Sequence, residues 1–173
     1  MNTRITTPEQ SIVYPYLPEG RSILQVSSEH PFMKLAREVA FEHKGSLTHT
    51  SGAVLVKDNT VIGTGSIGSG FHRTNGCARQ DKHVPTGMAY ELCLGCHPSN
   101  HSEQVALANA VINGHDPFQA EVYLWGHWWC CVACWSALEI ADVRQVYTLE
   151  NAHVFFEKSH PNNFLGRQEE VRN

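Results

Sequence analysis

The sequence has no long hydrophobic run and no large excess of one charge. No stretch among its 173 residues approaches the roughly 18 consecutive apolar residues that a membrane helix needs. Its 13 Lys and Arg residues and 17 Asp and Glu residues are spread along the chain and give a formal charge of −4. A charge balance of this kind argues against a broad nucleic-acid surface. We therefore expect no membrane partner and no broad nucleic-acid surface.

The first twenty residues also lack the apolar core of a signal peptide, and they carry Pro8, Pro15 and Pro18. We therefore expect a cytoplasmic protein. A chain of 173 residues, of which 42% are hydrophobic, suits one globular domain with a full core.

Cysteine is absent from the first 76 residues, and the six cysteines then fall at close spacing. A small secreted scaffold would scatter its cysteines to staple loops. Clustered cysteines in a cytosol-like chain that also has eleven histidines favour metal ligands. The alternative is that the thiols are buried small hydrophobes, as free cysteines often are. The six are Cys77, Cys93, Cys96, Cys130, Cys131 and Cys134.

The order of predicted elements indicates an α/β fold. Residues 1–29 are expected to be an irregular lead-in, residues 30–150 the main domain, and residues 151–173 a polar C-terminal extension that ends in a weak helix or a fraying tail. Hydrophobic periodicity within the domain predicts a helix, a β-hairpin, a long irregular connection, and then helix, strand, helix and strand. The corresponding ranges are 31–41, 51–65, 66–100, 102–113, 120–125, 131–140 and 144–149.

Two short motifs at predicted helix starts carry the chemistry. His101 and Glu103 are separated by one residue, and Cys131 and Cys134 are separated by two. Helix N-termini in adjacent βα units can converge at the ends of parallel strands. One imidazole and two thiolates would hold a zinc ion with its fourth position open, which is typical of a catalytic rather than a structural zinc. Glu103 could then relay a proton from water to a leaving group.

Each motif alone has a simpler explanation. Asn100 and Glu103 have the spacing of a capping box, so the glutamate could serve only the helix start. The Cys131–Cys134 pair could be a redox pair or half of a structural zinc site. Together, however, H-x-E followed by C-x-x-C is the pattern of the zinc deaminases.

From Pro31 to about Glu150 the chain resembles the cytidine and deoxycytidylate deaminase superfamily, most closely the dCMP deaminases. The resemblance implies a three-layer α/β/α domain with a mixed five-stranded sheet. It implies zinc ligands at His101, Cys131 and Cys134, with Glu103 as the proton shuttle. It also implies a homo-oligomer that converts a small molecule, dCMP, to dUMP and ammonia. Besides the zinc motif, it rests on the runs Gly76-Cys77-Ala78-Arg79, Val84-Pro85-Thr86-Gly87 and Tyr90-Glu91-Leu92-Cys93.

The chain departs from this family pattern at three positions. Ser102 stands where alanine is usual, and Cys130 stands where proline is usual. Ile67 occupies the position of an asparagine that helps hold the nucleoside sugar, and its side chain can neither donate nor accept a hydrogen bond. Ser66, Ser69 or Asn75 could supply that bond instead. If none does, the substrate could be a free base or another amino-heterocycle.

The remaining cysteines suggest a second, structural zinc ion. Cys77, Cys93, Cys96 and His97 are four ligand types within a connection that has few apolar residues, and a metal would order it. His72 and His83 are alternative fourth ligands. Some dCMP deaminases carry an extra zinc in this region.

Other residues are candidates for substrate contact. Trp128 or Trp129 could stack on a flat heterocycle, and Arg73 is among the cations that could meet a phosphate. Ser66, Ile67 and Ser102 complete this set. A third hypothesis is a zinc-stabilised binding module without turnover, but such a module would not need Glu103.

Overall fold

The computed structural model describes residues 5–6, 12–44, 47–85 and 87–170. Residues 1–4 and 7–11 of the expected lead-in, Thr86, and residues 171–173 of the expected C-terminal extension lie outside the described residues. Within the described ranges, no helix has the length and apolar character that crossing a bilayer requires.

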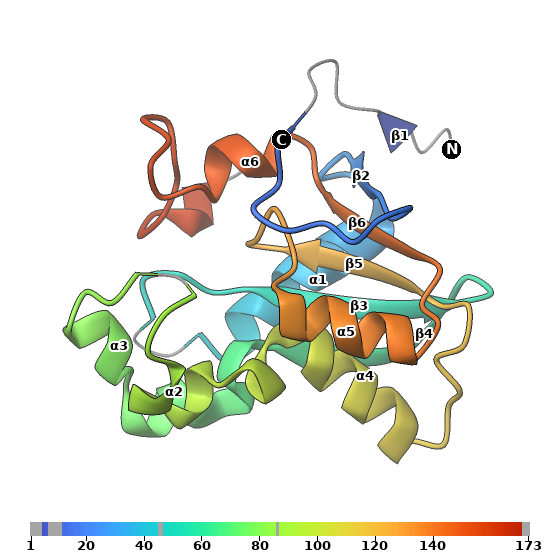
Figure 1. Cartoon of the computed structure of the whole chain (residues 1–173), viewed down its shortest axis with the longest axis horizontal. Helices are drawn as coiled ribbons and strands as arrows, with labels where there is room; N and C mark the ends of the chain where they lie inside the picture. The colour runs from blue at the N-terminus through green and yellow to red at the C-terminus, as the bar shows by residue number, and fades with distance from the viewer. Residues whose placement is uncertain (1–4, 7–11, 45–46, 86, 171–173) are drawn as a thin grey trace.

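Helices and strands alternate along most of the described chain (Figure 1). The strands are β1 (Ile5–Thr6), β2 (Ile23–Val26), β3 (Gly52–Lys57), β4 (Thr60–Ser66), β5 (Glu121–Trp125) and β6 (Gln145–Leu149). The α-helices are α1 (Pro31–Glu42), α2 (Phe71–Asn75), α3 (Ala78–Asp81), α4 (Ser102–Ile112), α5 (Val132–Ile140) and α6 (Ala152–Phe155). Short 3₁₀ helices cover Ile67–Gly70, Tyr90–Leu92, Leu94–Cys96, Pro98–Asn100 and Gln168–Glu170.

The described strands form one mixed sheet in the order β1-β2-β6-β5-β3-β4. β3 and β4 form an antiparallel hairpin, and β5 pairs antiparallel with β3. β6 then pairs parallel with β5, and β2 pairs parallel with β6. The predicted α/β fold with a mixed sheet is thus confirmed. Strands β2 to β6 make up the five-stranded sheet, and the two-residue β1 adds a short antiparallel strand at its edge.

β2 corrects the prediction that residues 1–29 are irregular. Its pairing with β6 runs from Ile23 opposite Val146 to Val26 opposite Leu149. Ile23 and Val26 are buried, so this segment is part of the core. Four residues are too few for an alternating pattern to stand out from sequence, and only the neighbouring strand makes the segment a strand.

The sheet separates two hydrophobic cores, which gives the domain three layers. On β3, Ala53 and Leu55 face the core formed with α4 and α5, whereas Val54 and Val56 face the core formed with α1. The alternation follows from the two-residue period of a strand. Figure 1 shows α4 and α5 on one side of the sheet and α1 on the other.

Helix α4 approaches β4 unusually closely at Gly65. A Cβ atom added there would lie 2.4 Å from the carbonyl oxygen of Ser102 and 2.5 Å from the backbone nitrogen of Ala106. Only glycine permits this contact, because the added carbon would overlap backbone atoms that cannot move aside. The first turn of α4, which contains Glu103, is therefore fixed against the sheet.

The C-terminal segment folds back onto the domain instead of fraying. Gln168 is buried, and its side-chain amide makes two bonds to the backbone of Thr50: Oε1 accepts from the nitrogen at 2.7 Å and Nε2 donates to the oxygen at 3.0 Å. Gly166 also donates a backbone hydrogen bond to Thr48. These bonds hold the segment around Gly166 and Gln168 beside the start of β3, and its described part ends in the short 3₁₀ helix Gln168–Glu170, which agrees with the expected weak helix rather than the fraying tail.

Candidate active site

His101, Cys131 and Cys134 converge at the starts of two helices. His101 is the N-cap residue of α4 and Cys131 that of α5, and Cys134 lies in the first turn of α5. The Nδ1 atom of His101 is 3.5 Å from the Sγ atom of each cysteine. Two elements that are thirty residues apart in sequence therefore present three metal-ligating atoms to one point.

The protonation of these residues fits a zinc site. A hydrogen bond from the Cys134 thiol, and a second from the His101 imidazole, lower the pKa of Cys131 to about 4. The same hydrogen bond and burial raise the pKa of Cys134 far above its usual value. A bound cation would replace the thiol proton of this pair and leave both sulfurs as thiolate ligands. Three ligands of this type leave a fourth position for water or substrate.

Glu103 lies beside these ligands and does not form the alternative capping box. Its side chain is buried, and its Oε2 atom accepts a hydrogen bond of 3.1 Å from the Ser102 hydroxyl. The Ser102 hydroxyl in turn lies 3.2 Å from that of Ser51 on the neighbouring strand segment. The N-cap residue of α4 is His101, and the Asn100 amide donates to the carbonyl of Leu94 instead. Glu103 is therefore held by a side-chain network next to the three ligands.

A cavity of about 600 Å³ opens onto this group. His101, Glu103 and Cys131 line it, so the open side of the ligand group faces a space large enough for a small molecule. Of the predicted substrate contacts, Ile67 and Trp129 line the cavity.

The other predicted substrate contacts do not line the cavity. Trp128 is buried and stacks on Tyr14 with ring centroids 5.8 Å apart. Ser102 is buried and bonded to Glu103, and Arg73 is exposed on α2. Ser66 is also buried, and its hydroxyl has no hydrogen-bond partner within the described structure.

The two other residues considered as replacements for the family asparagine do not change this result. Asn75 is exposed, and its amide donates to the carbonyl of Phe71 one helical turn earlier. The side chain of Ser69 lies outside what the structure describes. Ile67 therefore remains the apolar part of the cavity wall at this position.

A pair of stacked histidines in the cavity wall was missed from sequence. The rings of His49 and His127 are 5.6 Å apart, and both residues line the cavity. His49 Nε2 lies 2.6 Å from the carbonyl oxygen of Gly126, and His127 Nδ1 lies 3.0 Å from that of Trp129. Burial, reinforced by nearby His49 and His101, lowers the pKa of His127 to about 3, so both rings are uncharged at neutral pH.

The C-terminal segment supplies a second part of the wall that was missed. Lys158, Asn163 and Leu165 all line the cavity. Burial and the nearby charge of Arg79, another lining residue, lower the pKa of Lys158.

Of these missed residues, His127 had one sequence signal, its place between a strand end and Cys131, where α/β sites form. Nothing local indicated that the polar tail would reach the cavity.

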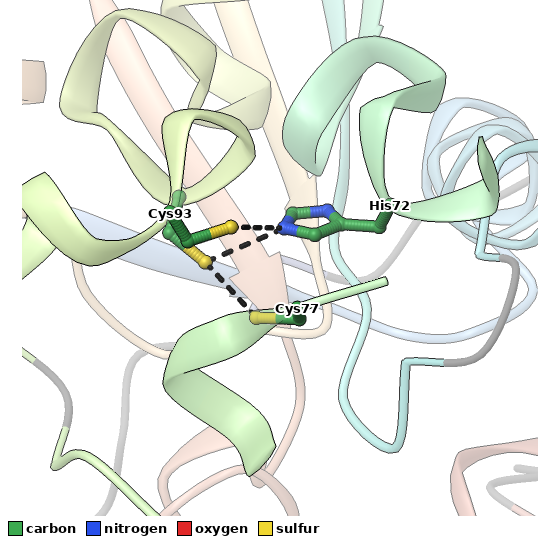
Figure 2. A group of neighbouring side chains, drawn as sticks. His72, Cys77 and Cys93 are labelled. Atoms are coloured by element: carbon green, nitrogen blue, oxygen red, sulfur yellow. Dashed lines mark hydrogen bonds between the residues drawn. The ribbon is translucent and has the colours of Figure 1, made fainter. Parts of the chain in front are cut away.

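A second group of metal-ligating side chains lies in the connection between β4 and α4. It consists of His72, Cys77, Cys93 and Cys96, and all four are buried. The Nε2 atom of His72 is 3.4 Å from the Sγ atoms of Cys93 and Cys96, and the Sγ atoms of Cys77 and Cys96 are 3.5 Å apart. Figure 2 shows His72, Cys77 and Cys93 turned toward one another from α2, the start of α3 and the following turn.

The fourth residue of this group is His72, and His97 does not belong to it. His97 is exposed, and its Nδ1 atom lies 2.8 Å from the hydroxyl of Ser99. At the tight turn Leu94–Cys96 the Cys96 side chain is buried and the next side chain, that of His97, is exposed. Two residues that are neighbours in sequence therefore point to different sides of the backbone. His83, the other alternative, is exposed and is not part of the group.

Comparison with known proteins points to one enzyme family. The model of the cytidine and deoxycytidylate deaminase zinc-binding region matches residues 26–150. The dCMP deaminase of the cyanophage S-TIM5, solved with dCMP and dUMP, is 25% identical with a TM-score of 0.49, over 68% of this chain and 76% of that one. The guanine deaminase of Bacillus subtilis is 20% identical with a TM-score of 0.43, over 69% and 62%. No curated protein matches the chain.

Proposed function

Because the chain belongs to the cytidine and deoxycytidylate deaminase zinc-binding family, and is thus a zinc-dependent hydrolytic deaminase, we propose that it converts dCMP to dUMP and ammonia. His101, Cys131 and Cys134 hold the zinc ion in this proposal, and Glu103 moves the proton. The observation that carries it is that the three ligand atoms converge on one point, and that Glu103 lines the same cavity as His101 and Cys131 of this group.

The chain's own residues divide the chemistry between them. When bound, zinc supplies a Lewis acid that lowers the pKa of a water ligand to about 7. The Glu103 carboxylate accepts the proton that the attacking water loses and delivers it to the amino group of the ring, which leaves as ammonia. Ser102 donates to Glu103 Oε2 and so fixes the direction of the carboxylate. The buried setting of Glu103 excludes bulk water from this transfer.

The cavity has features that suit a nucleotide. Tyr90, Trp129 and His127 offer ring faces to a flat pyrimidine. Arg79 and Lys158 both line the cavity, and no ion pair of either occurs within the described residues. Two cations that face one space favour an anionic substrate group, and the phosphate of dCMP supplies one.

Ile67 favours a second candidate substrate, a free base or another amino-heterocycle. It lines the cavity at the position where the family pattern has a sugar-binding asparagine. An apolar wall discriminates weakly between substrates, whereas a hydrogen-bonding site rejects those that lack the bonded group. The enzyme would then depend less on the deoxyribose.

One assay separates these candidates. Ammonia release is measured over cytosine, deoxycytidine, dCMP, guanine and adenine, with the Glu103→Gln variant prepared in parallel to detect contaminating enzymes. The proposal predicts the highest kcat/KM for dCMP. A higher value for cytosine would favour the free-base alternative. If the zinc-loaded protein released no ammonia from any of these compounds, that result would contradict the dCMP proposal and support the non-catalytic zinc module.

We also propose that His72, Cys77, Cys93 and Cys96 hold a second, structural zinc ion. The support is a four-ligand set, which is the composition of closed structural sites, in which every residue is buried. The surrounding segment has only a small apolar cluster of its own, so a metal would contribute directly to its folding.

We also propose that the protein is cytoplasmic and that it forms a homo-oligomer. All six cysteines are free thiols, which suits a reducing cytoplasm. Association of the chain with itself is supported by exposed apolar side chains on the two helices that flank the site. These are Val111, Ile112, Val132 and Ile140.

A further inference from the structure

One residue, Cys96, is a member of the second group of metal-ligating side chains and contacts the first group through its backbone. Its Sγ atom lies 3.4 Å from His72 Nε2 within the second group. Its backbone carbonyl oxygen lies 3.2 Å from His101 Nε2, the ring nitrogen that faces away from Cys131 and Cys134. The two proposed metal sites are therefore joined through the atoms of a single residue.

The contact to His101 has a defined chemical role. A carbonyl oxygen can only accept, so the contact requires a proton on His101 Nε2, and when a metal is bound Nδ1 would be the ring nitrogen left to ligate it beside the two thiolates. Metal-bound histidines are commonly oriented by such a partner on the second ring nitrogen, and loss of the partner typically lowers metal affinity 10- to 100-fold. The Cys96 carbonyl is that partner here.

The segment between Cys96 and His101 has little freedom to absorb a shift. The backbone nitrogen of Cys96 donates to the carbonyl of Cys93, and that of His101 donates to the carbonyl of Pro98. The Asn100 amide donates to the carbonyl of Leu94. Consecutive tight turns thus connect the second group to the start of α4, so we expect a shift of the Cys96 backbone to be passed on to His101.

A second contact from the same connection reaches the His101 ring. The ring of Tyr90 meets it edge-on with centroids 5.3 Å apart, and the guanidinium of Arg79 lies 4.5 Å from the centroid of Tyr90. Arg79 and Tyr90 follow Cys77 and precede Cys93 in sequence. The connection that the second group closes therefore holds His101 from two directions.

We propose that a metal ion bound by His72, Cys77, Cys93 and Cys96 positions His101 for the catalytic zinc, through the carbonyl of Cys96. The proposal rests on the two metal sites of the proposed function, but not on the identity of the substrate. Cys96 is accordingly a positioning residue, and the second metal sets the affinity of the first site in addition to stabilising the fold.

The test uses the zinc affinity of the first site and the histidine nitrogen signals. Cys77→Ser removes a ligand of the second group, and serine can still cap α3 as the Cys77 sulfur does at 3.4 Å from the nitrogen of Gln80. In ¹⁵N-histidine-labelled protein, His101 reports the first site and His72 the second, each assigned from its own His→Asn variant. Zinc is then withdrawn with a chelator of known affinity.

We expect Cys77→Ser to lose the His72 zinc signal and to bind zinc at His101 about 10- to 100-fold more weakly, with a changed His101 Nε2–H signal. Met33→Ala is the matched control, because it destabilises the α1 core on the other face of the sheet and should leave the His101 affinity unchanged. Equal His101 affinity and signals in wild type and Cys77→Ser would overturn the proposal, as would an equal loss in Met33→Ala.

A zinc titration of the wild-type protein decides the matter if Cys77→Ser does not fold. The proposal predicts that the His101 signals reach their zinc-saturated positions only when the His72 signals also show bound zinc. If the His101 signals reached their zinc-saturated positions while His72 was still metal-free, the proposal would be contradicted. Since neither measurement uses substrate, a protein inactive on dCMP could still show the coupling, and an active one could lack it.

Discussion

The two groups of metal-ligating side chains differ in where their residues come from and in what surrounds them. His101, Cys131 and Cys134 lie at the starts of two long helices that pack on the sheet, and His101 and Cys131 border a cavity of about 600 Å³. The second group comes entirely from the connection between β4 and α4, and all four of its residues are buried, with Cys77 and Cys96 forming part of the wall of the same cavity. The first group has three ligands, and the second has four.

In the roles proposed above, this difference would let one chain use the same residue types for catalysis at one site and for structural stability at the other. A three-ligand site on rigid elements keeps a position for chemistry, and the framework holds it without help from the metal. A four-ligand site in a segment with little apolar content is closed, and there the metal supplies the order that a core would supply elsewhere. The Glu103 carboxylate lies in the cavity wall with His101 and Cys131 of the first group.

The largest expected effect tests the catalytic side of this comparison. Glu103→Gln should retain zinc and lower kcat by roughly 10²- to 10⁴-fold or more, because the amide cannot accept the proton that the carboxylate takes. The measurement is ammonia release together with zinc analysis of the same preparation. Normal turnover by this variant would mean that Glu103 has only a structural role, and the contrast between the two groups would lose its main support.

The next largest effect concerns the zinc ion that we propose for the second group. Cys93→Ser should lower the zinc content from two ions per chain to one and leave the His101 site occupied. A buried ligand set with one member missing should also cost about 2 kcal/mol of the free energy of unfolding, or a fall in Tm of roughly 4–8 °C. Metal analysis and thermal unfolding measure the two effects.

His97→Gln is the matched control for Cys93→Ser, because His97 is next to Cys96 in sequence but outside the group. It should change neither the zinc content nor Tm. If His97→Gln lost one zinc ion per chain while Cys93→Ser kept both, His97 rather than Cys93 would be a ligand of the second zinc ion.

A smaller effect sharpens the chemistry of the cavity. Ile67→Asn should raise kcat/KM for dCMP relative to cytosine by up to about tenfold, since a new hydrogen bond to the sugar is worth about 0.5–1.5 kcal/mol. Ile67→Val, which keeps the wall apolar, serves as the comparison. If the asparagine leaves the ratio where the valine does, Ile67 has no part in selecting the substrate.

The smallest effect is a pH dependence of stability. The pKa of His127 is about 3 in the folded protein against an ordinary value of 6.5, so between these values the unfolded chain binds more protons. The free energy of unfolding must then fall as the pH drops below about 6.5. Between pH 7.5 and 6 we expect roughly 0.8 kcal/mol from this histidine.

Urea unfolding of wild type and His127→Gln at both pH values measures this contribution. The zinc ligands titrate in both proteins, so the difference between the two reports the contribution of His127 together with its coupling to His49 and His101. An identical pH dependence of the free energy of unfolding in the variant would show that His127 does not cause the loss of stability at low pH.

Much of the fold was predictable from local pattern. The helices at 102–113 and 131–140 and the strands at 51–65, 120–125 and 144–149 are long enough for apolar residues to repeat at the helical or strand period. β2 was not predictable in this way, because its four residues become a strand only by pairing with β6. The packing of Gln168 on Thr50 was likewise hidden, since a polar side chain gives no hydrophobic signal.

The sequence by itself determined the ligand types, their spacing and their places at the starts of helices. His101, Cys131 and Cys134 lie at or beside helix N-termini because short motifs act over a single turn, where covalent connection sets the geometry. Only the tertiary structure decided which residues meet across longer distances. It placed His72 rather than His97 beside Cys96, and it brought Lys158 from the C-terminal segment to the cavity. The reason is physical: contacts between distant segments depend on how the whole sheet and its connections pack, and no local pattern records that packing.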